Sequence, residues 1–137
     1  MARPNIITGD SSKRIEKHQT FFQHKRGFSP ILLEVLDLEQ RIGNKDICKV
    51  RWHIIGKDRI STSVFMMAAK DGIFADFVPV PRVAYQQAVR ILNNLKKEVK
   101  EQESKQNAPL AQDEKLRVHR NAKRRVLRLI DKYLGKR

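Results

Sequence analysis

Two neighbouring stretches of the chain alternate between apolar and polar residues with a period of two. In residues 47–55, one face is made of Cys48, Val50, Trp52 and Ile54. In residues 59–67, one face is made of Ile60, Thr62, Val64 and Met66. A period of two is typical of half-buried strands, so both stretches are predicted to be strands.

The loop between these strands decides which side chains share a face. The tripeptide Gly56-Lys57-Asp58 has the composition of a hairpin loop. A three-residue loop pairs Ile54 with Ile60, which keeps one face uniformly apolar, whereas a two-residue loop mixes the two faces. In the three-residue register Trp52 belongs to the core. The opposite, outer face then carries Lys49, Arg51, His53, Arg59 and Phe65.

Further along the chain, turns and a change of period complete the predicted core. Residues 70–72 predict a second turn, and residues 73–80 a third strand that ends at prolines. From residue 82 to 103 the apolar residues recur with the period of an amphipathic helix. Residues 104–112 are polar, contain Pro109 and are predicted to be a linker, and residues 113–134 form a last amphipathic helix that ends at Gly135.

Residues 31–42 form an apolar segment whose period is ambiguous. Ile31, Val35, Leu38 and Ile42 fit a helical stripe, whereas a strand explains only part of the pattern. Ser29-Pro30 resembles the start of a helix and Gly43-Asn44 its end, which favours a helix over a strand.

Charge is distributed unevenly along the 137 residues. The chain holds 29 Lys and Arg against 15 Asp and Glu, for a formal net charge of +14. Residues 1–28 contribute +4, residues 29–104 only +2, and residues 105–137 contribute +8. We therefore expect a basic, flexible arm (1–28), a core domain (29–103), the linker (104–112) and a basic C-terminal helix (113–137). An excess of this size is typical of proteins that bind a polyanion.

The last helix concentrates this charge in a stripe. Arg117, Asn121, Arg124, Arg128 and Lys132 follow one another at helical spacing, and the flanking residues are Arg120, Lys123 and Arg125. Like charges at this spacing repel, and a bound phosphate backbone would relieve the repulsion. The alternatives are an ordinary solvated helix face and a helix on a membrane surface. The membrane is disfavoured because the apolar side of the helix lacks Trp and Phe.

The outer face of the predicted hairpin is a second candidate site. Positive charge at Lys49, Arg51, His53 and Arg59, combined with the ring of Phe65, is the arrangement by which proteins hold single strands. The charges follow the backbone and the ring stacks on a base. The alternative is a solvent-exposed face made of ordinary strand residues.

Catalytic and metal sites find little support in the sequence. The four histidines are scattered, and Cys48 is the only cysteine, so neither a metal site nor an intrachain disulfide is expected. A nuclease-like acidic cluster of Glu34, Asp37, Glu39 and Asp46 beside Lys49 is the enzymatic alternative, but no pattern fixes its convergence on one ion. We find no phosphate-binding glycine loop and no nucleophile with a base. We therefore expect no enzyme activity, no cofactor and no small-molecule substrate.

The sequence predicts an α+β fold: an antiparallel β-meander of about three strands packed by a long amphipathic helix, with a basic C-terminal helix. Open sheet edges favour a homodimer. The predicted function is non-enzymatic binding of DNA or RNA, single-stranded or sequence-nonspecific, through phosphate contacts, in a protein of viral or plasmid origin. The alternatives are a winged helix-turn-helix regulator, with helices at 31–42 and 44–55, and a structural component of a nucleoprotein particle. Without a signal peptide or an apolar run of 18 residues, a cytoplasmic location is expected, or a nuclear one in a eukaryote.

Overall fold

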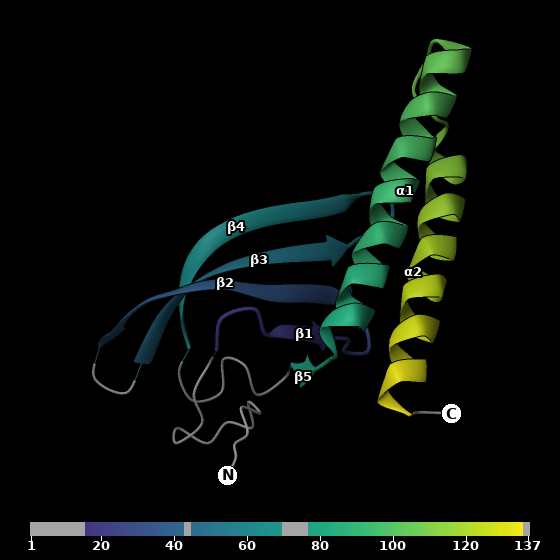
Figure 1. Ribbon diagram of the computed structural model, residues 1–137. Coiled ribbons are helices and arrows are strands. Elements are labelled where there is room, and N and C mark those ends of the chain that lie inside the picture. The colour runs from purple at the N-terminus through teal and green to yellow at the C-terminus, as the bar shows by residue number, and fades with distance from the viewer. Residues whose placement is uncertain (1–15, 43–44, 70–76, 136–137) are drawn as a thin grey trace.

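The computed structural model describes residues 16–42, 45–69 and 77–135, without the side chains of 39–42, 45–46 and 68–69. Its five-stranded antiparallel sheet has the order β4-β3-β2-β1-β5. The strands are β1 (Thr20–Gln23), β2 (Ile31–Ile42), β3 (Lys45–Ile55), β4 (Ile60–Ala69) and β5 (Val78–Pro79). Two helices follow, α1 (Arg82–Gln106) and α2 (Gln112–Leu134). They lie side by side at one end of the strands, and β2, β3 and β4 extend away from them (Figure 1). The fold is α+β, as predicted.

Residues 31–42 form a strand, so the prediction of a helix there is wrong. β2 is the central strand, and Leu32, Leu33 and Val35 are completely buried. A strand covered on both faces has a continuous apolar run instead of an alternating one, and such a run resembles a buried helix. Irregular pairing with β3 on either side of Asp37 disturbs the period further. Because β2 and β3 are both strands, the winged helix-turn-helix alternative loses the two helices that it required.

The β3–β4 hairpin has a register one residue away from the predicted one. Ile55 pairs with Ile60 across a four-residue turn, Gly56–Arg59, in which the Gly56 N–H donates to the Arg59 carbonyl at 2.9 Å. A Cβ atom at Gly56 would lie 2.9 Å from that oxygen, which explains the glycine. The predicted register assumed that only one face of the sheet is apolar. Both faces carry apolar residues, so that assumption led to the wrong register.

The predicted arm and third strand both contribute short strands. Residues 20–23 form β1, and its Phe21 and Phe22 are buried, whereas Phe28 is exposed. Within the predicted third strand, residues 78–79 form β5, which pairs with β1 and not with β4. The predicted turn at 70–72 and residues 73–76 lie outside the described part of the chain, as do residues 1–15.

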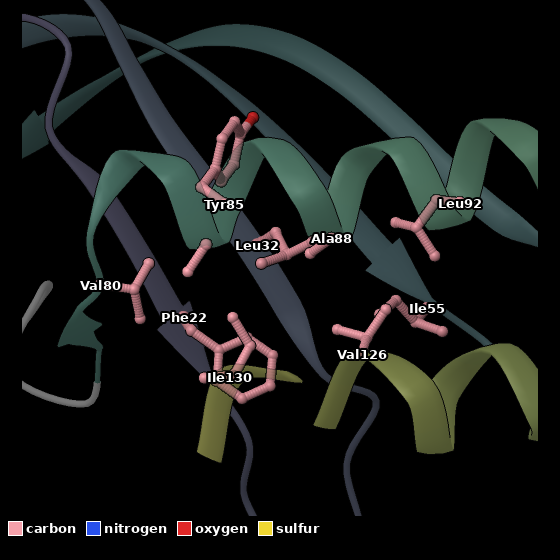
Figure 2. Packing of buried hydrophobic residues seen from close by; sticks show 10 residues of the cluster. Phe22, Leu32, Ile55, Val80, Tyr85, Ala88, Leu92, Val126 and Ile130 are labelled. Carbon is pink, nitrogen blue, oxygen red and sulfur yellow. The ribbon is translucent and has the colours of Figure 1, made fainter. Parts of the chain in front are cut away.

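Both predicted helices are confirmed, and they enclose one of the two cores. Residues 104–106 continue α1, and Asn107 ends it in a left-handed conformation, so the loop between the helices is shorter than the predicted linker. Figure 2 shows this core, in which both helices meet the ends of the central strands. Its members are Phe22, Leu32, Ile55, Val80, Ala84, Tyr85, Ala88, Leu92, Val126 and Ile130.

A second core lies on the opposite face of the sheet. Its buried residues are Phe21, Leu33, Val35, Cys48, Val50 and Phe77. Half-buried Trp52 packs against it, as predicted for the core. Phe65 does so as well, with its ring in an edge-on contact 4.7 Å from that of Trp52.

Candidate nucleic-acid interface

The basic stripe predicted for the last helix lies on the exposed side of α2. Burial of His119, Ala122, Val126 and Ile130 fixes which side of α2 faces the protein. The predicted residues that this orientation leaves exposed are Arg117, Arg120, Arg124, Arg125, Arg128 and Lys132, and Lys123 is half-buried. The structure therefore presents the predicted stripe as one surface, which we call the α2 basic face.

Within the described part of the chain, few of these charges are neutralised by carboxylates. Arg117 pairs with Glu114 one turn earlier on α2. Among the described residues, no carboxylate forms an ion pair with any other member of the α2 basic face. The electrostatic potential of exposed, unpaired cations extends into the solvent and attracts a polyanion.

The β3–β4 turn extends this positive surface. The Gln112 side-chain amide donates to Asp58 Oδ2 at 3.1 Å, which ties the turn to the start of α2. Lys57 and Arg59 flank Asp58 and are exposed. Of the predicted sheet-face residues, Arg59 therefore lies in the turn that is joined to α2.

The structure contradicts the predicted position of Phe65 on the outer face of the sheet, beside Lys49 and Arg51. Lys49, Arg51 and His53 do share a face. Val50 pairs with Phe65, however, so the Phe65 ring points to the opposite face and packs against Trp52. Val64 and Met66 occupy the positions on β4 that face Arg51 and Lys49. Apolar side chains without a π-face cannot stack on a base as Phe65 was expected to do.

His53 is buried beneath α1 and is therefore not a surface contact. Its Nδ1 atom lies 3.0 Å from Thr62 Oγ1, and its Nε2 atom lies 3.2 Å from Tyr85 Oη. Tyr85 in turn donates to Glu34 Oε1 at 3.2 Å. Since the tyrosine proton goes to Glu34, the histidine must donate from Nε2 and accept from Thr62 at Nδ1.

Glu34 is the acidic centre of this network and is itself buried. Arg51 Nη1 lies 3.4 Å from Oε1, and Arg82 Nη1 lies 3.2 Å from Oε2. These contacts connect β2, β3 and α1 around one carboxylate. A buried charge needs such partners, because an unpaired one would strongly destabilise the fold. Arg51 thus has a structural role in addition to any contact with a ligand.

Burial sets the protonation of the two neutral members of this network. The pKa of His53 falls from 6.5 to about 4, mainly through desolvation and then through repulsion by Lys96 and Arg51, with a smaller opposing effect of Glu34. Burial also raises the pKa of Tyr85, and the negative charge of Glu34 adds to that rise. Near neutral pH both side chains stay neutral, so the network joins α1 to the sheet without a change of charge on either ring.

Sequence reasoning did not identify the roles of Glu34, Arg82 and Tyr85. The available signal was a glutamate inside an apolar run, which a buried position permits only with partners. Asp37, another member of the predicted acidic cluster, is exposed, and its Oδ1 atom lies 3.9 Å from Lys17 Nζ. The side chains of Glu39 and Asp46 lie outside the described residues. Within the described part of the chain, no three His, Cys, Asp or Glu residues are grouped so as to hold a metal ion.

Comparison of the chain with protein-family models, curated proteins and solved structures found no match. None of the helices in the described ranges is long and apolar enough to cross a membrane.

Proposed function

We propose that the protein is a non-enzymatic nucleic-acid-binding protein that holds phosphate groups on the α2 basic face. The observation that supports this most strongly is the set of exposed cations on α2 that lack ion-pair partners among the described residues. From Arg117 to Lys132 the face extends for about 22 Å at the rise of an α-helix. A surface of that length reaches several consecutive phosphates.

Contacts of this kind favour binding without sequence specificity. Arginine and lysine side chains that reach phosphates position a protein on nucleic acid but read no bases. The rings of Trp52 and Phe65 pack against the core, and Tyr133 is an exposed ring at the end of α2. We therefore propose binding that tolerates both single and double strands, with no base-stacking platform on the sheet.

A pair of charge-matched double variants tests this proposal. Arg124→Gln with Arg128→Gln removes two charges from the α2 basic face, whereas Arg90→Gln with Lys97→Gln removes two exposed charges from α1. Fluorescence anisotropy with a 20-nucleotide oligomer should show a loss of about tenfold or more for the α2 variant, if each lost contact is worth about 1 kcal/mol. The α1 variant should lose much less. Equal losses in the two variants would mean that net charge, not this face, attracts the nucleic acid.

A structural role in a nucleoprotein assembly is favoured by the edge of the sheet. β4 is the edge strand beside β3, and its ten residues include no charged residue and no proline. Natural sheets protect long edges with charge or proline, so an unprotected edge is suited to pairing with another strand. We propose that a second copy pairs with β4 about a two-fold axis. Because β4 is uncharged, such pairing brings no like charges together within the strand.

Two exposed valines provide a matched test of this pairing. Val64 lies on β4 and is 48% exposed, and Val83 lies on α1 and is 46% exposed. Val64→Lys should produce a monomer in size-exclusion chromatography with light scattering, because it places a charge on the edge. Val83→Lys adds the same charge and should remain dimeric. A monomeric unmodified protein would rule out the β4 dimer.

A further inference from the structure

A pocket between the β3–β4 turn and α2 has a distinctive chemical lining. Its volume is about 330 Å³, and it is lined by Gly56, Lys57, Leu116, His119, Arg120 and Lys123. The volume lies at the lower end of the range for small-molecule sites and exceeds what one inorganic phosphate needs. A sugar or a base therefore has room beside a phosphate.

Three of the side chains that line this pocket are cations. Lys57 comes from the turn, and Arg120 and Lys123 come from successive turns of α2. Among the described residues, no carboxylate lines the pocket. The neighbouring Asp58 is engaged by the Gln112 side chain and lies 3.8 Å from Arg59. Three cations from two elements therefore line one space that no carboxylate of the described residues lines, and this arrangement favours an anion.

His119 is a nearly buried polar residue that lines the same pocket. Its side chain is almost fully buried, with the residue 7% exposed, and Nδ1 donates to the Lys115 carbonyl at 2.8 Å. Among the described residues, no partner bonds its Nε2 atom. Because Nδ1 carries the proton of the ring, Nε2 is an acceptor, and it therefore suits a donor such as a sugar hydroxyl or a base amino group beside the phosphate.

We propose that this pocket binds a phosphorylated end of a nucleic acid, with Lys57, Arg120 and Lys123 around the terminal phosphate. A terminal phosphomonoester carries nearly two negative charges at neutral pH, against one for an internal phosphodiester. Three converging cations match the terminal group better. The pocket shares Arg120 and Lys123 with the α2 basic face, so a chain bound along that face lies next to the pocket. The inference rests on the proposed function and specifies which part of the nucleic acid the pocket holds.

Three versions of one oligonucleotide test the proposal: with a 5′-phosphate, with a 3′-phosphate, and with hydroxyls at both ends. The full-length protein should bind one of the phosphorylated versions about tenfold more tightly than the hydroxyl version, as charge-assisted hydrogen bonds predict. Lys57→Gln should remove this preference. Arg59→Gln changes the same turn by the same charge without touching the pocket, and it should keep the preference.

Adenosine 5′-monophosphate, with adenosine as its control, separates this inference from the proposed function. Binding of the nucleotide with NMR shifts at Gly56 and His119, lost in Lys57→Gln, would support the pocket even if long oligonucleotides do not bind. Suppose instead that the unmodified protein binds all three oligonucleotides with equal affinity, and that Lys57→Gln weakens the three affinities by the same factor. That result would mean that the pocket holds an internal phosphate, and it would overturn the inference. It would leave the proposed function intact. Equal affinities that Lys57→Gln does not change would also overturn the inference.

Discussion

The buried His53 makes the stability of the protein depend on pH in a defined window. The perturbation is His53→Gln, which keeps a polar side chain between Thr62 and Tyr85 but cannot titrate. In the folded protein the pKa of His53 is lowered to about 4 from its ordinary value of 6.5. Protonation therefore favours the unfolded chain. The stability contributed by the neutral histidine is complete above pH 6.5 and is lost as the pH falls towards 4.

The size of the effect follows from the shift in pKa. Each pKa unit corresponds to about 1.4 kcal/mol, so a shift of this size removes about 3 kcal/mol from the free energy of unfolding between pH 7 and pH 4. The pKa falls because His53 is only 6% exposed and lies near the cations Lys96 and Arg51. Lys96 and Arg51 repel an imidazolium, and Glu34 offsets only part of that repulsion.

Urea denaturation at several pH values measures this contribution. The unmodified protein should lose about 3 kcal/mol more than His53→Gln between pH 7 and pH 4, whatever the starting stability of the variant. The other ionisable side chains are the same in both proteins, so the difference isolates His53. Parallel stability curves, or an NMR titration of the His53 ring with a pKa near 6.5, would refute the account of the network.

Further substitutions test other parts of the structure. Tyr85→Phe should lower the free energy of unfolding by about 1–3 kcal/mol, because His53 and Glu34 each lose a buried hydrogen bond; a neutral result in urea denaturation would contradict this. Ile130→Ala should cost about 2–5 kcal/mol, because its side chain is fully buried between α2 and the sheet. Deletion of residues 107–137 should therefore unfold the rest, and a folded circular dichroism spectrum would count against it. Phe65→Ala should lower the melting temperature and leave nucleic-acid affinity unchanged; a selective loss of single-strand binding would restore the stacking role.

Periodicity in the sequence predicted the elements whose two faces differ. Most of β3 has a core on one face and polar residues on the other, so its residues alternate. Each helix has one buried and one exposed side, so its apolar residues recur with the helical period. β2 was wrongly predicted to be a helix, because residues 32–35 are buried on both faces and burial on two sides removes the period. The short strand β1 was missed because only Phe21 and Phe22 are strongly apolar in an otherwise polar segment.

The two candidate sites differ in how far the sequence could predict them. The α2 basic face depends only on helical spacing within one element, so the residues predicted together do lie together. The sheet face depended on register, and a shift of one residue moved Phe65 to the other side. The pocket lined by Lys57 and His119 could not be predicted without knowing that two elements far apart in the chain lie close together in the fold. Spacing within one segment cannot provide that distance.

The salt dependence of binding tests most directly whether the α2 basic face holds phosphates. Each phosphate contact contributes about 0.7 to 0.9 to the slope of log affinity against log salt concentration. We expect a steep slope for the unmodified protein. For the Arg124→Gln, Arg128→Gln double variant we expect a slope lower by about 1.4 to 1.8, and for Arg90→Gln, Lys97→Gln a slope nearly unchanged. A flat salt response of the unmodified protein, or equal slopes in all three proteins, would contradict the account.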